Sequence, residues 1–345
     1  MIQNIDLQLY DLNKINHGFS DIELETLCGV VAGEYSHSHP QNLEQKPALY
    51  FMGKVNGYGT ALRNLLNLPG WYPLPFSLDH GIAFASELSS FEQNKASAHF
   101  VWDKERYDAL AYKHGSRIRR IRNPVISMIE RQNIKKVSDA QGTIVFIPHT
   151  NDSCTLRPYN WHNYISKIEQ RFKKSKRIVL CIHPHDIKNG NYKKFRQFGK
   201  PLITFGNNTS DLFIHRFLST LIHFEYATGI SPGSEAFYCS SIEVDYIQFG
   251  EKIDYVYAPN STADDNSDNL VKKYRDQRDH LFSEQQKNSE QTKQFIADRM
   301  GLDISIEDST AALRRILIRD SILLILPLTK IIIKNLLKAV LGRNK

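Results

Sequence analysis

Between residues 142 and 250 the chain alternates short apolar runs with helix-like segments. The predicted strands are Thr143–Pro148, Arg177–Ile182, Pro201–Phe205, Phe224–Ile230 and Val244–Phe249. The predicted helices between them are Trp161–Lys174, Tyr192–Phe198, Asp211–His223 and Glu235–Ser241. Short strands separated by helices are joined by crossovers, which make the strands parallel in one sheet. The alternation therefore predicts a Rossmann-like α/β domain.

The flanking segments predict a second α/β unit and a polar extension. The apolar run Ala48–Gly53 leads through a glycine-rich turn into the helix-like segment Ala61–Leu66. Residues 260–269 read as a polar loop, and residues 270–300 as exposed helix. We therefore expect an acceptor-side α/β domain over 1–138, a nucleotide-binding domain over 139–259, a polar loop and exposed helix over 260–310, and a basic tail over 311–345.

The cysteines and the N-terminus indicate a reducing compartment. Four cysteines, Cys28, Cys154, Cys181 and Cys239, form no CxxC pair and no metal-ligand spacing. We expect buried thiols, because disulfides persist mainly in oxidising compartments. The segment Met1–Asp6 has neither a basic nor an apolar signal region. These features predict a cytoplasmic protein.

The net charge of +7 is concentrated at the end of the chain. Residues 311–345 hold eight Lys or Arg residues and one acid, so the rest of the chain is neutral overall. Nucleic-acid binding needs basic residues spread over a folded face. We therefore expect no nucleic-acid partner.

The tail has the pattern of a membrane-surface helix. Its uncharged run, residues 321–329, is too short to span a bilayer, which needs about 20 apolar residues. Lys330, Lys334 and Lys338 recur every four residues and share one helical face, and the other faces are apolar. This pattern predicts binding to an anionic membrane, on the inner face of the cell membrane. The alternative is a C-terminal helix packed on the protein's own core.

Polar residues gather where the predicted strands of the second domain end. His149, Thr150 and Asn151 end the first strand, and His183, Pro184 and His185 end the second. Ser231, Gly233, Ser234 and Glu235 follow the strand Phe224–Ile230. Open α/β sheets bind ligands at the carboxyl ends of their strands, and helix N-termini bind phosphate. These residues predict a nucleotide-sugar site.

Each of these residues has an expected role. His183 would stabilise the leaving phosphate, Ser231 and Ser234 would donate hydroxyls to it, and Glu235 would accept from a ribose hydroxyl. The alternative role of the serines is to cap the following helix. We expect no metal, because no Asp, Glu or Cys cluster at ligand spacing surrounds the histidines.

The first domain supplies a candidate base. Asp79–His80–Gly81 places a carboxylate beside an imidazole, and either group could take a proton from an acceptor hydroxyl. The alternative is that Asp79 caps a helix starting near Ile82. The loop containing Gly57, Tyr58 and Gly59 is expected near the acceptor, although it matches neither GxGxxG nor the P-loop.

These motifs resemble those of the bacterial sialyltransferases and related CMP-sugar transferases of GT-B architecture. That family is similar in carrying an acidic motif ending in glycine, an HP motif and a serine-bearing turn. The counterparts here are Asp79–Gly81, His183–Pro184 and Ser231–Ser234. The resemblance implies a GT-B-like fold with two Rossmann-like domains facing a cleft. It also implies that Asp79 deprotonates the acceptor, His183 assists departure of CMP, and Ser231 and Ser234 hold its phosphate.

A neighbouring resemblance is to the CDP-glycerol and CDP-ribitol transferases of wall and capsule assembly. Those enzymes also carry HG and HP motifs and dock on membranes. This resemblance implies that His80 is the base, so the choice between Asp79 and His80 stays open.

The preferred hypothesis is an inverting, metal-independent glycosyltransferase. It moves an acidic sugar, of the nonulosonic acid or Kdo type, from a CMP donor to a surface polysaccharide or lipid-linked glycan. The alternatives are a CDP-glycerol or CDP-ribitol phosphotransferase and a non-catalytic scaffold for glycan assembly.

Overall fold

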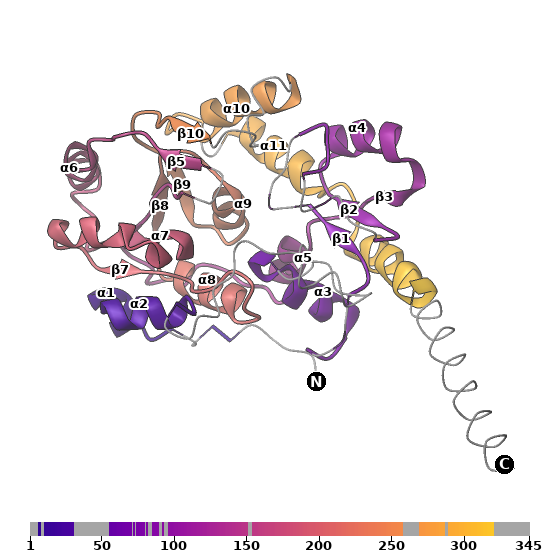
Figure 1. Cartoon of the computed structure of the whole chain (residues 1–345), viewed down its shortest axis with the longest axis horizontal. Helices are drawn as coiled ribbons and strands as arrows, with labels where there is room; N and C mark the ends of the chain where they lie inside the picture. Colours follow the sequence, from indigo (N-terminus) through magenta and orange to yellow (C-terminus); the bar gives the residue numbers. More distant parts are fainter. Residues whose placement is uncertain are drawn as a thin grey trace, which may run out of the picture.

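The computed structural model of the chain describes most of its residues. The described residues are 6–7, 10–30, 55–70, 72, 74–79, 81, 85–89, 92, 96–150, 154–257, 269–286 and 289–320. They form two α/β units, each with its own parallel sheet (Figure 1). This is the α/β architecture with two sheet-containing units that the sequence predicts.

The C-terminal unit contains a five-stranded parallel sheet of order β7-β6-β4-β8-β9. Its strands are β4 (Thr143–Phe146), β6 (Ile178–Cys181), β7 (Leu202–Ile203), β8 (Tyr226–Gly229) and β9 (Asp245–Gln248). The connecting helices are α6 (Trp161–Arg171), α7 (Pro184–Lys188), η5 (Asn191–Phe198), α8 (Phe213–Leu221) and α9 (Ser234–Ser241). In the central strand β4, Thr143 pairs with Ile178 of β6 and with Tyr226 of β8. All five predicted strands and the four predicted helices are confirmed, with α7 in addition.

The N-terminal unit has a smaller parallel sheet of order β1-β2-β3. Its strands are β1 (Ser77–Leu78), β2 (His99–Val101) and β3 (Ile118–Arg120). Its helices are η3 (Val55–Gly57), α3 (Tyr58–Leu66), α4 (Lys104–His114), η4 (Gly115–Arg117) and α5 (Pro124–Arg131). The predicted strand Ala48–Gly53 and His80 lie outside the described residues.

Local sequence explains where the helices begin. Helix α5 starts at Pro124, whose missing N–H is no loss in a first turn, and Asn123 accepts from the amides of Val125 and Ile126. Helix α4 starts after Asp103, which accepts from the Arg106 amide. These caps satisfy amides that helices otherwise leave unpaired.

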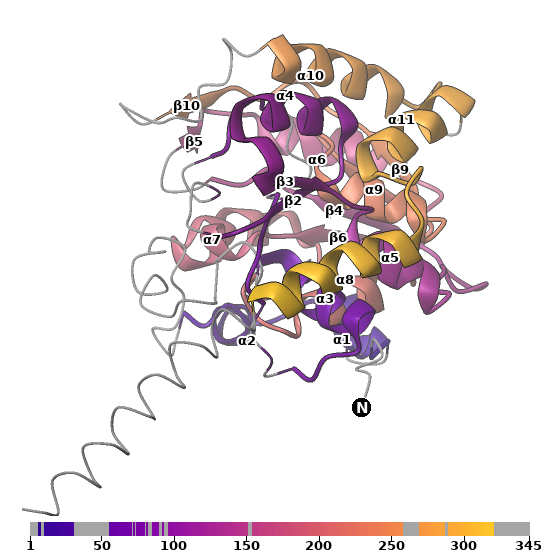
Figure 2. The ribbon, with the colours of Figure 1, turned by 90° about the vertical axis from the view of Figure 1, so that its right-hand side faces the viewer.

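Each end of the described chain packs against the unit that lies farther from it in the sequence. Helices α1 (Leu12–His17) and α2 (Asp21–Leu27) pack beside the C-terminal sheet, where the Phe19 amide donates to the Leu202 carbonyl at 2.8 Å. The helix of residues 306–320, yellow in Figures 1 and 2, returns to the N-terminal unit, where the Arg122 amide donates to Ser309 Oγ at 2.9 Å. Each unit is therefore completed by the distant end of the chain.

Residues 270–300 form two helices rather than one exposed segment. They are α10 (Asn269–Leu281) and α11 (Glu290–Met300). Both have a buried face, which includes Val271, Tyr274, Phe295 and Met300. The expected exposed helix thus describes one face of each helix, and the polar residues that dominate this segment concealed the apolar face in the sequence. A short antiparallel pair, β5 (Cys154–Leu156) with β10 (Tyr255–Tyr257), lies nearby.

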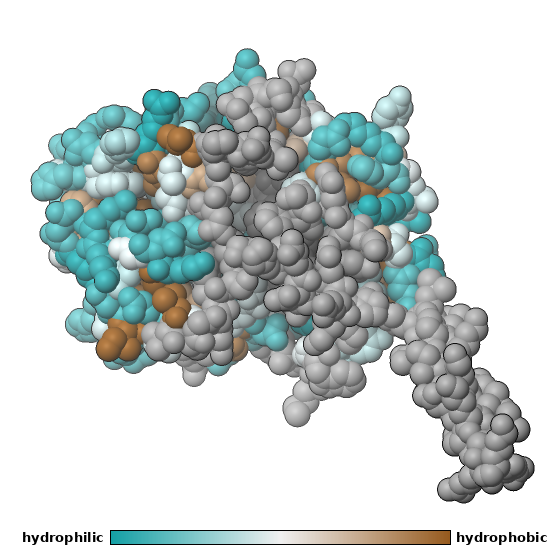
Figure 3. Space-filling view, viewed as in Figure 1, coloured by the Kyte–Doolittle hydropathy of each residue, from teal (hydrophilic) through white to brown (hydrophobic). Residues whose placement is uncertain are grey.

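On the face that Figure 3 shows, the described surface is mostly hydrophilic, with its apolar residues in several separate patches. The large exposed apolar side chains are Leu12, Ile22, Tyr112, Leu212, Val256 and Ile318. All four cysteines are buried and none forms a disulfide, as the sequence predicts. No helix among the described residues has the length and hydropathy needed to cross a bilayer.

Candidate functional site

The strand order places one functional edge in the C-terminal unit. From β4 the chain moves outward through β6 and β7, and then returns to β8 on the other side of β4. The strand order therefore reverses between β4 and β8, so the carboxyl ends of these two strands form a topological switch point. Open α/β sheets bind their ligands at such a point. His149 and Thr150 follow β4, and the turn of residues 231–235 follows β8.

Two histidines lie stacked at this edge. The rings of His149 and His183 are 3.9 Å apart at an interplanar angle of 16°. His183 caps α7, and its Nδ1 accepts from the His185 amide at 3.2 Å, which leaves the proton of a neutral ring on Nε2. His149 Nδ1 instead donates to the Thr150 carbonyl at 3.0 Å. The two rings therefore present opposite tautomers, and His183 Nε2–H is a donor suited to an anion.

Asp186 fixes this arrangement. Its carboxylate accepts from Thr150 Oγ1 at 2.8 Å and from Asn191 Nδ2 at 3.0 Å. The loop after β4 is thus tied to the first turn of α7. Asp186 is a site residue that sequence reasoning missed, although its place three residues after His183 in a strand-end motif was a usable signal.

His185 is a buried residue of α7. Its side chain is 2% exposed, and its Nε2 lies 2.8 Å from Asn189 Nδ2, one turn along the same helix. Pro184 is also buried, as the first residue of α7. Helix α7 turns both residues toward the unit's interior, and their contact with a nucleotide stays a prediction.

The turn of residues 231–235 is held by a carboxylate and not by serine caps. Gly233 is the N-cap of α9 and has no side chain to cap with, and its amide donates to Glu235 Oε1 at 2.8 Å. Desolvation raises the pKa of the Glu235 carboxyl, and Arg278 and His149 act in the opposite direction. Neither Ser231 nor Ser234 caps α9 through its hydroxyl.

Arg278 of α10 contributes a positive charge to the same turn. Its Nη2 donates to Ser231 Oγ at 2.7 Å, and the guanidinium also pairs with Asp279. The side chain is 14% exposed. Sequence reasoning missed Arg278, because it lies within a segment rich in Lys, Gln and Arg where no residue stands out.

Asp79 lies inside the N-terminal unit at the end of β1. Its side chain is fully buried, and Oδ1 accepts from Arg106 Nε at 3.0 Å and from His99 Nε2 at 3.1 Å. Arg106 also pairs with Glu92 at 2.9 Å. A carboxylate with no solvent-exposed surface and a guanidinium partner cannot reach an acceptor hydroxyl in this arrangement. The helix-capping alternative for Asp79 concerns Ile82, which lies outside the described residues.

Asp79, Glu92 and His99 also form a candidate metal group, since their ligand atoms lie within 4.8 Å of one another. Arg106 donates to both carboxylates and places its own cation between them. Two positive charges would repel each other there. These residues therefore do not fit a metal ion.

Gly81 of the N-terminal unit meets the turn of residues 231–235 of the C-terminal unit. Gly81 has a φ of +65°, and a Cβ atom on it would lie 2.7 Å from Ser234 Oγ. The structure thus brings together two motifs that are far apart in the sequence. Of the predicted site, the edge contains His149, Thr150, His183, Ser231, Gly233, Ser234 and Glu235.

Gly57, Tyr58 and Gly59 are buried in the contact between the units. A Cβ atom on Gly57 would lie 2.3 Å from Ile214 Cβ of α8. The Tyr58 hydroxyl lies 3.0 Å from that of Tyr238 in α9. Close packing against α8 accounts for the glycine at position 57, and the acceptor-side role of these residues stays a prediction. His80, Asn151, Lys330, Lys334 and Lys338 lie outside the described residues.

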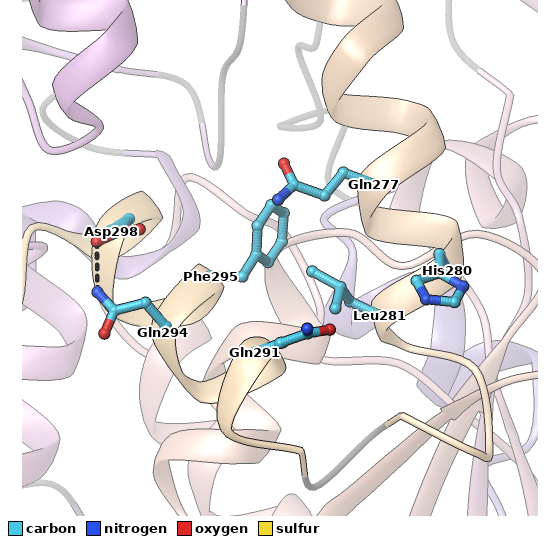
Figure 4. Close-up of a pocket in the computed structure, with 7 residues that line it drawn as sticks. All are labelled: Gln277, His280, Leu281, Gln291, Gln294, Phe295 and Asp298. Atoms are coloured by element: carbon cyan, nitrogen blue, oxygen red, sulfur yellow. Dashed lines mark hydrogen bonds between the residues drawn. The ribbon is translucent and has the colours of Figure 1, made fainter.

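A surface groove of about 440 Å³ runs between α10 and α11 (Figure 4). Buried Leu281 and Phe295 form its floor. Gln294 and Asp298, joined by a hydrogen bond of 2.8 Å, lie on its rim. The groove includes none of the motif residues, so it is separate from the candidate site.

Comparison with known proteins gives little beyond the fold. No family model matches the sequence, and no curated protein matches it. Among solved structures, the wall teichoic acid polymerase TagF is similar at 9% identity and a TM-score of 0.37, over 69% of this chain and 66% of that one. A TagF histidine variant soaked with CDPG is similar at 10% identity and a TM-score of 0.34, over 65% of this chain and 56% of that one. At these TM-scores the function must be argued from this chain's own residues.

Proposed function

We propose that this protein is a transferase that moves a polyol phosphate, of the glycerol or ribitol phosphate kind, from a CDP-activated donor to a hydroxyl of a glycan or lipid-linked acceptor. The observation that carries this choice is the burial of Asp79 in a pair with Arg106. If Asp79 is not the base, the Asp–His–Gly motif works through His80, as the resemblance to CDP-glycerol and CDP-ribitol transferases implies. The choice of a cytidine nucleotide in the donor rests on the same resemblance.

The proposed reaction is a displacement at the β-phosphorus of the donor. The acceptor oxygen forms a bond to this phosphorus and gives its proton to His80. The bond from the phosphorus to the bridging oxygen breaks, and CMP leaves with the electron pair. Charge develops on the leaving phosphate, so hydrogen-bond donors aimed at it speed the step.

The edge of the C-terminal sheet supplies those donors. His183 Nε2–H, the Ser231 and Ser234 hydroxyls and the Arg278 guanidinium are the groups proposed to bind the phosphates. Glu235 is proposed to accept from the ribose hydroxyls. None of these roles needs a metal, because Arg278 and the α9 N-terminus already supply positive charge.

The test compares two kinds of donor, CDP-polyols and a CMP-activated sugar, and four variants. We expect the wild type to release CMP from CDP-glycerol or CDP-ribitol faster than from a CMP-activated sialic acid. His80→Asn and His183→Ala should lose activity, and His162→Ala, at an exposed histidine of α6, should retain it. Arg278→Met should weaken donor binding.

Other outcomes decide against the proposal. Release of CMP from the CMP-sugar alone would favour the acidic-sugar transferase. Nucleotide binding without turnover of any donor would favour a scaffold. Binding is read by thermal shift, where a nucleotide at 100 times its Kd stabilises by about 2.7 kcal/mol.

The tail is proposed to hold the enzyme peripherally on the inner face of the membrane, near its acceptor. Residues 311–320 belong to a helix with Leu313 buried, so truncation belongs after Asp320. The truncated protein should no longer sediment with anionic liposomes but should still release CMP from a soluble donor. Unchanged sedimentation would contradict the membrane role.

A further inference from the structure

Arg106 is the centre of a buried network that joins three segments of the N-terminal unit. Its Nε donates to Asp79 and its Nη2 to Glu92, and its Nη1 donates to the carbonyls of Ala85 and, at 3.1 Å, Glu87. The Asp79, Glu92 and Arg106 side chains are at most 2% exposed. A planar guanidinium with several fixed acceptors has few alternative orientations. The network therefore fixes α4, the loop before β2 and the end of β1 relative to one another.

Residue 79 is held through both its main chain and its side chain. The Asp79 amide donates to the Phe100 carbonyl at 3.0 Å, and Oδ1 accepts from Arg106 and His99. Its Oδ2 is buried and has no hydrogen-bond partner among the described residues. A pair selected for stability alone would satisfy both oxygens, and unsatisfied buried groups call for another explanation.

Gly81, two residues after Asp79, touches the proposed donor site. It lies so close to Ser234 that a methyl group at position 81 would displace the serine hydroxyl. We propose that Asp79 is a positioning residue: the Asp79–Arg106–Glu92 network holds Gly81 against Ser234. It thereby sets the place of the Ser234 hydroxyl at the proposed phosphate site. This inference rests on the proposed function.

The first test separates a positioning role from that of a base. Asp79→Asn should lower kcat about 100-fold, the cost of a misplaced hydroxyl at the leaving phosphate, and leave the donor KM and the acid limb of the pH–rate profile unchanged. Glu92→Gln perturbs the same network from its far side and should show the same pattern more weakly. If Asp79→Asn removed the acid limb, or were as inactive as His80→Asn, Asp79 would be the base and the inference would be overturned.

The second test needs no activity. Gly81→Ala, Ser234→Ala and the double variant form a cycle read by the free energy of unfolding. Removing Ser234 Oγ makes room for the methyl group at 81, so the double variant should be more stable than the sum of the single changes predicts, by at least about twofold in the unfolding equilibrium constant. Strict additivity would overturn the contact. An inactive wild type would defeat the proposed function, and the stability cycle would still show whether Gly81 meets Ser234.

Discussion

The two parallel sheets are stabilised in different ways. The C-terminal sheet is enclosed in apolar side chains, and Ile144, Val145 and Leu180 are fully buried in it. The N-terminal sheet buries ionised groups beside its strands, among them Asp79 and Arg106. Apolar burial is non-directional and tolerates small shifts, whereas each buried charge needs its partner at a set distance. The comparison indicates that the C-terminal sheet depends on apolar burial, whereas the N-terminal sheet also depends on buried charge pairs at set distances.

The largest effect should come from removing the central cation. Arg106→Met leaves the Asp79 and Glu92 carboxylates buried without it, which should cost about 3–5 kcal/mol in the free energy of unfolding. Urea titration measures it. Arg119→Met, at an exposed arginine of β3, is the control and should change stability by less than about 0.5 kcal/mol. Equal losses in the two variants would remove the contrast between the sheets.

A core truncation tests the other sheet. Leu180→Ala in β6 should cost about 3 kcal/mol, since it leaves a cavity in a fully buried position. The control, Leu212→Ala, removes a side chain that is 44% exposed and should cost much less. A loss below about 1 kcal/mol for Leu180→Ala would mean that the C-terminal core is loosely packed.

Glu235→Gln, at the edge of the C-terminal sheet, should raise the stability of the protein and weaken its nucleotide binding. Desolvation raises the folded-state pKa of this carboxyl above its ordinary value of 4.5. The stability contributed by the protonated carboxyl is fully present below pH 4.5 and is lost as the pH rises through the folded-state pKa. At pH 7 the uncharged amide should therefore give a higher Tm than wild type, and the difference should vanish in acid.

The same variant should bind CMP about tenfold more weakly, since a neutral amide accepts less strongly from ribose hydroxyls. Differential scanning fluorimetry across pH and calorimetric titration with CMP measure the two effects. Glu307→Gln, at an exposed position, should leave both unchanged. A lower Tm at pH 7 would show that the carboxylate stabilises its turn.

The smallest effect concerns the contact between the units. Tyr58→Phe and Tyr238→Phe each remove one hydroxyl of a buried pair at 3.0 Å. Each should cost about 1 kcal/mol, and the double variant less than the sum. Tyr112→Phe, at a 92% exposed ring, is the control. Additive losses would mean that the two hydroxyls stabilise the protein independently.

The C-terminal fold was predictable because its strands are continuous apolar runs. The segment Ile178–Cys181 is buried on both faces, so its periodicity identifies a parallel strand without help from its neighbours. In the N-terminal sheet, β1 spans only Ser77–Leu78 and is followed by a buried aspartate. A two-residue strand leaves no pattern to detect, and the sequence does not show that Asp79 has a distant arginine partner.

The candidate site, too, was predictable only where the local sequence places its residues. Residues at strand ends, such as His183 and Ser231, were found because the chain itself places them at the sheet edge. Arg278 was missed because a helix far along the sequence brings it there. The close packing of Gly57 against Ile214 could not be predicted, because it is a tertiary property.

The packing of each chain end against the distant unit has a consequence during synthesis. The ribosome releases α1 and α2 before the sheet that they cover, which begins more than a hundred residues later. The N-terminal sheet, in turn, waits for residues 306–320, which follow long after its own strands. Helices α1 and α2 therefore keep exposed apolar surface until the C-terminal sheet emerges, and the N-terminal sheet keeps its own until residues 306–320 follow.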